Sequence, residues 1–218
     1  MDQESPSPAL PEVSEAALGL LHCIEALAQE QTNPVLLLLR DVARLEAGRR
    51  YPQESLLLMG DRWRCFYHCH DSPAKSPEEH GHFHFFAACG DGTVRRWTHV
   101  AALSMDQQGQ PLCWFTVNRW VTDGPWVAAQ ALGGLLHWQQ VGEKIPLLQR
   151  WLSLAAQFYA GTILDLLSQR DHKLMEIKPA SPQADILEDR KIYLLSRQQI
   201  DLRADLTATL TETDGMPG

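Results

Sequence analysis

The sequence predicts an α+β fold: an antiparallel sheet of about four strands, near residues 62–119, flanked by N-terminal and C-terminal helices. Helical periodicity occurs before residue 50 and after residue 125. The stretch between is rich in aromatic and β-branched residues and is interrupted by Gly and Pro, as strands joined by turns are. The connections between these strands are short, which favours an antiparallel meander.

Two helices are predicted before the sheet. Apolar side chains recur at helical spacing over residues 13–29, from Val13 to Leu27. The pair Asn33-Pro34 predicts the start of a second helix, because Asn favours the N-cap and Pro the first helical position. Gly48 is a stop signal, so this helix is expected to end near Glu46.

Strands and further helices follow from the same signals. The strands are expected near residues 62–70, 81–89, 97–105 and 112–119, with turn residues at 71–77, 90–92 and 108–111. Helical spacing returns at 126–138 and over 146–170, and Ser181-Pro182 can start a short helix. Residues 191–196 are interpreted as a last strand, with a helix as the alternative.

Length and composition predict one domain over residues 13–210, with disordered tails at 1–12 and 211–218. The acidic, Pro- and Ser-rich N-terminus lacks the basic start and apolar core of a secretory signal, so a cytoplasmic protein is expected. No apolar run approaches the roughly 18 residues of a membrane span. A net charge of −8 argues against nucleic acid or an anionic membrane as a partner. A small-molecule substrate fits, and the oligomeric state is left undefined.

The most distinctive feature is a group of histidines. Five of the nine in the chain lie in one short stretch: His68, His70, His80, His82 and His84. Side chains alternate between the two faces of a strand, so the even-numbered positions share a face. An in-register hairpin would set His70 opposite His80 and His68 opposite His82, with Cβ atoms about 5 Å apart. All five imidazoles are then expected on one face.

Imidazoles in this arrangement predict a transition-metal site with Fe, Zn, Cu or Ni bound by His68, His70, His80, His82 and His84. Glu79 is a candidate carboxylate ligand or base if the loop folds inwards. Tyr67 and Cys69 are expected on the opposite face. Phe66 and Phe86 would lie beside the histidines, where an apolar surround keeps imidazoles neutral and able to bind metal.

The segment His80-Gly81-His82-Phe83-His84 also resembles the H-x-H-x-H motif of the histidine-triad nucleotide hydrolases and transferases. That resemblance implies metal-free phosphate chemistry, with His82 as the nucleophile and His80 and His84 supporting it. Gly81 departs from the apolar residues usual in that motif. The wider H-x-H…H-G-H-x-H pattern, followed by Thr116 to Thr122, resembles an uncharacterised family of bacterial proteins. This resemblance implies an intact domain and adds little about function.

Two further residues, Arg119 and His99, are candidates for the same site. Arg119 could clamp a carboxylate or phosphate beside Trp120, and a salt-bridged edge residue next to a core Trp is the alternative. His99 is an additional ligand candidate if the third strand neighbours the second.

The favoured hypothesis is a metalloenzyme that activates water or dioxygen, with His82, Glu79 and Arg119 as catalytic candidates. An all-histidine set suits an open coordination position, whereas structural zinc sites are usually cysteine-rich and closed. The alternatives are a metal-free, histidine-triad-like nucleotide phosphohydrolase or transferase, and a non-enzymatic metal-binding or interaction protein.

Overall fold

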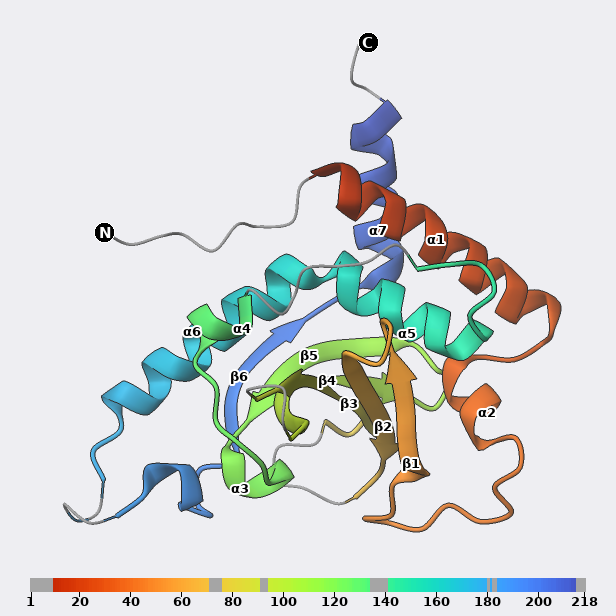
Figure 1. The fold of residues 1–218 in the computed structure, drawn as a ribbon. Coiled ribbons are helices and arrows are strands. Elements are labelled where there is room, and N and C mark those ends of the chain that lie inside the picture. Colours follow the sequence, from red (N-terminus) through yellow and green to blue (C-terminus); the bar gives the residue numbers. More distant parts are fainter. Residues whose placement is uncertain are drawn as a thin grey trace.

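The computed structural model describes residues 10–70, 76–90, 94–133, 141–179, 181 and 184–214. It has an α+β fold built on a six-stranded antiparallel sheet with strand order β1-β2-β3-β4-β5-β6 (Figure 1). The strands are β1 (Tyr51–Leu58), β2 (Trp63–His68), β3 (Glu79–Cys89), β4 (Arg96–Asp106), β5 (Pro111–Val117) and β6 (Leu194–Gln199). The four strands predicted from the sequence correspond to β2 to β5.

The expected sheet of about four strands is therefore too small, because β1 and β6 add an edge strand at each end. β1 contains Pro52, its Ser55 has a φ of 66°, and its pairing with β2 is shifted between Tyr51 and Leu56. Proline and irregular pairing are tolerated at a sheet edge but weaken the sequence signal for a strand. β6 is partly the strand expected at 191–196, displaced to Leu194–Gln199.

The helices lie before β1 and after β5, in the order that the periodicity predicts. They are α1 (Leu10–Gln29), α2 (Pro34–Leu39), α3 (Arg119–Thr122), α4 (Ala129–Gly133), α5 (Leu147–Phe158), α6 (Ala160–Glu176), the 3₁₀ turn η1 (Ile186–Glu188) and α7 (Leu202–Asp214). None of the described helices is long and apolar enough to cross a membrane.

Helix boundaries differ from expectation at several points. The Asn33 side chain accepts hydrogen bonds from the backbone N–H groups of Val35 and Leu36, as an N-cap does. α2 nevertheless ends at Leu39, and the Val42 N–H donates a hydrogen bond to the Leu39 carbonyl just beyond this end. The helix expected over 146–170 is two helices separated at Tyr159, and the one expected at 126–138 runs into residues 134–140, outside the described part.

A helix extends into each of the two segments that were predicted to be disordered tails. α1 begins at Leu10, and α7 continues to Asp214, so residues at the inner end of each expected tail are helical.

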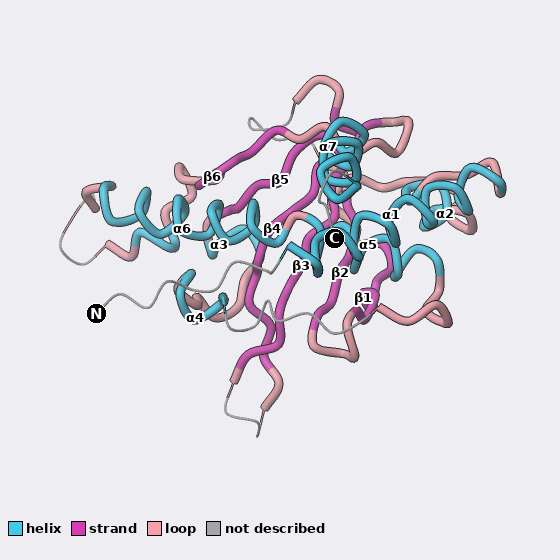
Figure 2. Tube along the Cα trace, turned by 90° about the horizontal axis from the view of Figure 1, so that it is seen from above, coloured by secondary structure: helices cyan, strands magenta, loops and turns pink. Residues whose placement is uncertain are grey.

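Helices cover one face of the sheet. α1, α5, α6 and α7 lie together on that side, as the two ribbon views show (Figures 1 and 2). The main core is buried between them and contains Tyr67, Phe83, Phe85 and Trp114 from the strands, together with Trp151 from α5. Because side chains alternate along each strand, the residues between these point to the opposite face. That second face carries the histidines.

A smaller apolar cluster covers one end of the second face. Ala102, Cys113, Phe115 and Val117 are buried there, and Val121, Tyr193 and Leu194 pack against them. These covering residues come from α3 and from the chain at the start of β6, and α3 lies beneath the sheet in Figure 1. This small apolar cluster therefore borders the histidine-bearing part of the second face on one side.

Candidate metal centre

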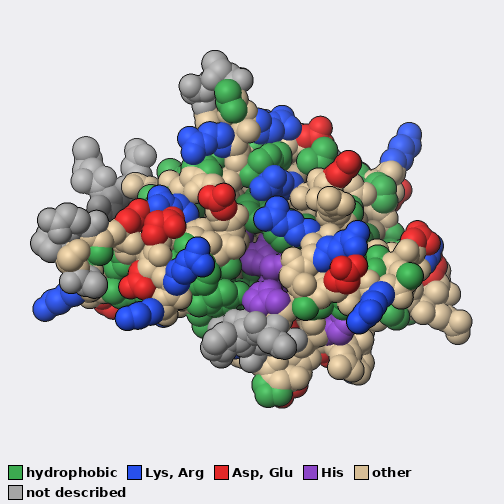
Figure 3. All heavy atoms as spheres, turned by 90° about the horizontal axis from the view of Figure 1, so that it is seen from below, with side chains coloured by type: hydrophobic (Ala, Val, Ile, Leu, Met, Phe, Trp, Pro, Cys, Tyr) green, Lys and Arg blue, Asp and Glu red, His purple; other side chains and the backbone are tan. Residues whose placement is uncertain are grey.

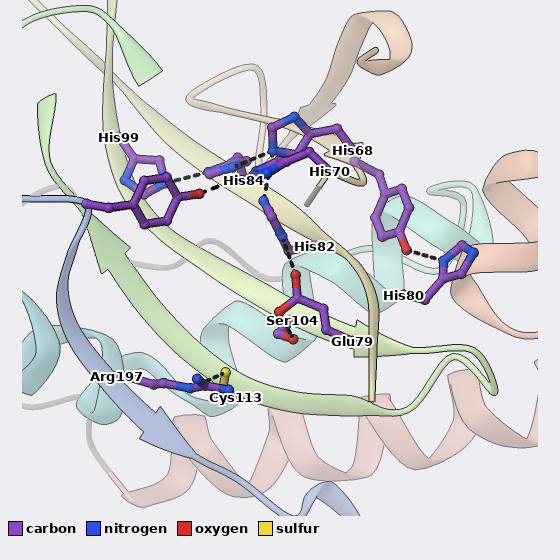
Figure 4. Close-up of polar contacts among 12 residues, drawn as sticks. His68, His70, Glu79, His80, His82, His84, His99, Ser104, Cys113 and Arg197 are labelled. Carbon is purple, nitrogen blue, oxygen red and sulfur yellow. Dashed lines mark hydrogen bonds and ion pairs between the residues drawn. The ribbon is translucent and has the colours of Figure 1, made fainter. Parts of the chain in front are cut away.

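Three histidines converge on one point of the second face. His68 on β2 pairs directly with His82 on β3, as the hairpin parity predicts. The Nε2 atom of His68 lies 2.8 Å from Nε2 of His82 and 3.0 Å from Nε2 of His84 (Figure 4). The possible ligand atoms of these three residues all lie within 4.8 Å of one another, so the group can hold a metal ion. We call His68, His82 and His84 the histidine cluster.

His80 does not join the cluster, which corrects the expectation that five imidazoles share one face. Its Nδ1 atom lies 2.6 Å from the Tyr67 hydroxyl, and its ring stacks on that of Tyr67 (Figure 4). The cause is a β-bulge: Glu79 pairs with Asp106 and Gly81 with Met105, so His80 is the extra residue. A bulge interrupts the alternation on which the parity argument depends.

Gly81 packs closely against the neighbouring strand β2. A Cβ atom at this position would lie 2.6 Å from the Tyr67 hydroxyl and 2.7 Å from the His68 carbonyl oxygen. Only a residue without a side chain fits so close to the neighbouring strand. The glycine that departs from the histidine-triad pattern is therefore required by the packing of this hairpin.

The same bulge brings Glu79 to the cluster. Its carboxylate Oε1 lies 2.7 Å from Nδ1 of His82, and its Oε2 accepts a hydrogen bond of 2.7 Å from the Ser104 hydroxyl. Ser104 sits opposite His82 on β4. Glu79 is buried, with a side chain 6% exposed. Both carboxylate oxygens thus contact protein groups, and Glu79 lies behind His82 rather than beside the three Nε2 atoms.

A second bulge brings in His99. The pairing of β3 with β4 shifts between Phe85 and Phe86, so that Phe86 faces His99 instead of Val100. His99 consequently turns to the histidine face, where its Nε2 lies 2.9 Å from Nδ1 of His84. The expectation that the third predicted strand neighbours the second is confirmed, but His99 supports a cluster member and is not one itself.

Burial sets the protonation of these groups. Desolvation, followed by the proximity of His82 and His70, lowers the pKa of His68 to about 3. Desolvation lowers the pKa of His84 well below its usual value, with His82 and His99 acting in the same direction. Desolvation and then Arg170 lower the pKa of His99 to about 3. These imidazoles are therefore neutral near pH 7, the form that binds metal.

His70 lies at the edge of the cluster. Its ring centroid is 4.9 Å from that of His68 and 5.2 Å from that of His82. Its Nε2 atom lies 3.3 Å from the hydroxyl of Tyr193, which reaches in from the chain before β6 (Figure 4). Tyr193 had no signal in the sequence that linked it to the histidines, because the contact joins distant segments.

Arg119 is held in ion pairs with two acidic residues. It begins α3, and its guanidinium contacts Asp185 at 2.7 Å and Glu188 at 2.8 Å. Hydrogen bonding to Glu188 raises the pKa of Arg119 further. Asn118 caps α3 instead of closing a strand, and Trp120 donates to the Ile192 carbonyl. These contacts match the salt-bridged alternative for Arg119, and its ion pairs are with residues outside the histidine cluster.

The histidine face is accessible in part. Figure 3 views the molecule from below and shows histidine side chains in a hollow near the middle of this surface, bordered by Lys and Arg side chains. His68 and His70 are half-buried, whereas His82 and His84 are 3% and 1% exposed.

The fold and the site together define an α+β protein with a largely buried histidine cluster on the second face of an antiparallel sheet. The chain belongs to the family described as a domain of unknown function (DUF6969), whose model matches residues 14–200. This agrees with the resemblance to an uncharacterised family. No curated protein and no solved structure matches the chain.

Proposed function

We propose that this protein is a metalloenzyme in which His68, His82 and His84 bind a transition-metal ion through their Nε2 atoms. The observation that carries the proposal is the approach of these atoms to 2.8 and 3.0 Å. When the protons of His82 and His84 are on Nδ1, a single proton on His68 Nε2 can be donated to only one of the two Nε2 atoms that face it. A single cation satisfies all three at bond lengths of about 2.0–2.1 Å.

Hydrogen bonds on the far side of the rings support this assignment. When the His82 proton is on Nδ1, this N–H donates to the Glu79 carboxylate and leaves the Nε2 lone pair free for a metal. His84 does the same when its Nδ1–H donates to Nε2 of His99. A carboxylate or a second acceptor behind a ligating imidazole is the usual outer shell of a metal centre.

The ligand count favours catalysis. Catalytic sites commonly have three protein ligands and an open position, whereas structural zinc sites are closed and rich in cysteine. None of the five cysteines forms a disulfide, and none belongs to the cluster. The half-buried His70 and the Tyr193 hydroxyl border the cluster, and we propose that these side chains orient a bound small molecule. A bound metal would supply Lewis acidity or redox chemistry, and its identity among Fe, Zn, Cu and Ni decides which.

The histidine-triad alternative has less support. It requires His80 and His84 to assist His82 from one strand face, but His80 contacts Tyr67 on the other side of the sheet. The accessible hollow and the set of only three histidine ligands favour an enzyme over a purely metal-binding protein.

Metal analysis tests the proposal. Protein purified without an affinity tag is expected to retain a stoichiometric transition metal, measured by inductively coupled plasma mass spectrometry. His84→Ala should lose it, because one of three ligands is removed. His80→Gln and the exposed His172→Ala should keep it. Circular dichroism establishes that each variant is folded. Wild-type protein that binds no added transition metal would overturn the proposal, as would a His80→Gln variant that loses the metal.

A further inference from the structure

Two arginines lie beside the histidine cluster. The guanidinium carbon of Arg50 is 4.6 Å from the ring centroid of Phe66, and that of Arg64 is 4.8 Å from the ring centroid of Phe86. The two phenyl rings stack on each other at 5.4 Å. Arg64 also lies 5.1 Å from the ring of Trp97. The aromatic rings thus hold two guanidinium groups close together.

This pair is adjacent to the proposed metal ligands. The Phe66 ring lies 5.4 Å from the ring of His84 and 5.7 Å from that of His68. Phe86 also contacts His84, at 6.3 Å between centroids. Arg50 lies close enough to contribute to the lowered pKa of His68. Only one layer of aromatic side chains therefore separates the guanidinium groups from the cluster.

Neither arginine has an acidic partner within the described ranges. Arg40, Arg49, Arg119 and Arg170 form ion pairs with carboxylates, whereas Arg50 and Arg64 form none with the residues that the structure describes. The Nε atom of Arg64 is buried and has no hydrogen-bond partner there. Arg197, on the same face of the sheet, differs because its Nε donates to Cys113 Sγ at 3.2 Å.

A bound anion would relieve the charge repulsion in this arrangement. Burial lowers the pKa of the Arg64 guanidinium, and the neighbouring positive charge of Arg50 lowers it further. The nearby carboxylate on this face, Glu79, contacts His82 and Ser104. Two like charges that repel each other, with a buried N–H that lacks an acceptor, would be stabilised by a bound anion. Guanidinium groups favour oxyanions with two oxygens, such as carboxylate or phosphate.

We propose that Arg50 and Arg64 bind the carboxylate or phosphate group of an anionic substrate, whose reacting part then lies over the histidine cluster. This inference rests on the proposed function for the identity of the reacting centre, but the anion site itself does not need the metal. The Lys and Arg side chains that border the hollow in Figure 3 agree with an anionic ligand.

Anion binding to the full-length protein tests the proposal. Inorganic phosphate and succinate are titrated separately, at constant ionic strength, by isothermal titration calorimetry on metal-loaded and metal-free wild type. One of these two probes is expected to bind saturably to both forms, and the more tightly bound probe identifies the oxyanion class. Arg64→Gln and Arg50→Gln should each weaken binding by about tenfold or more, since a charge-assisted bond is lost. The matched control is Arg49→Gln, because Arg49 is adjacent in the chain but paired with Glu46 at 2.7 Å.

The outcomes separate the two proposals. Metal content should be unchanged in the arginine variants, because neither arginine is a ligand. If neither probe binds saturably, or if Arg49→Gln weakens binding as much as Arg64→Gln, the anion site is wrong while the metal site stands. If anions bind through Arg50 and Arg64 but no transition metal binds, the metalloenzyme proposal fails and the anion site remains.

Discussion

Replacing Glu79 by Gln tests whether this residue positions His82 for metal binding. The carboxylate lies 2.7 Å from His82 Nδ1 and 2.7 Å from the Ser104 hydroxyl, in a buried setting. Gln keeps the size and can still accept a hydrogen bond, but it removes the negative charge that makes the Nε2 atom more basic. Loss of such an outer-shell group weakens metal binding by about 10–100-fold. This corresponds to about 1.4–2.8 kcal/mol, which agrees with the contribution of about 1.5–3 kcal/mol from a hydrogen bond to a charged group.

Competition against a chromophoric chelator measures the dissociation constant of the metal in wild type and in Glu79→Gln. Ser104→Ala is the matched control, because it removes one contact of Glu79 and leaves the charge beside His82. We expect a smaller loss of affinity in Ser104→Ala than in Glu79→Gln. An affinity that is unchanged in a folded Glu79→Gln variant would refute the positioning role.

Three other substitutions give distinct readouts. Gly81→Ala should destabilise the protein by about 1–3 kcal/mol in urea unfolding, since its Cβ would lie 2.6 Å from the Tyr67 hydroxyl; wild-type stability would contradict the close-packing argument. His99→Leu should weaken metal binding less than loss of a ligand does, because it removes the acceptor 2.9 Å from His84 Nδ1, and complete loss of metal would instead make His99 a ligand. Arg119→Ala should leave metal content unchanged and reduce stability by at most about 1 kcal/mol, as expected for a part-exposed ion pair; metal loss in this variant would contradict the assignment of Arg119 to a salt bridge outside the histidine cluster.

The sequence predicted the centre of the site because the relevant information is local. His68 and His82 face each other across a hairpin, and His84 follows His82 on the same face, so strand alternation was enough to bring the three together. The conformation of the turn between the strands was not needed, because the face that each residue occupies follows from which residues pair across the hairpin. The four central strands were predicted because aromatic and β-branched residues are frequent in them and turn residues lie between them.

Two β-bulges limited the prediction of the remaining residues. One displaces His80 and brings Glu79 to the histidine face, and the other turns His99 towards His84. A bulge depends on how β3 fits against β4 and on the close contact at Gly81, and alternation within one strand does not contain that information. The sequence did not predict three residues near the histidines, because only the assembled sheet brings them there. These residues are Tyr193, Arg50 and Arg64. The ion pairs of Arg119 were not predicted because its acidic partners, on η1 and just before it, are distant in sequence.

The central claim is that one metal ion is bound by His68, His82 and His84. Anomalous diffraction at the absorption edge of the metal that the purified protein contains tests it most directly. We predict one anomalous peak about 2.0–2.1 Å from the Nε2 atoms of all three residues, with Glu79 behind His82 and not bonded to the metal. A peak bonded to His80, or no peak at the histidine cluster in metal-loaded crystals, would contradict it.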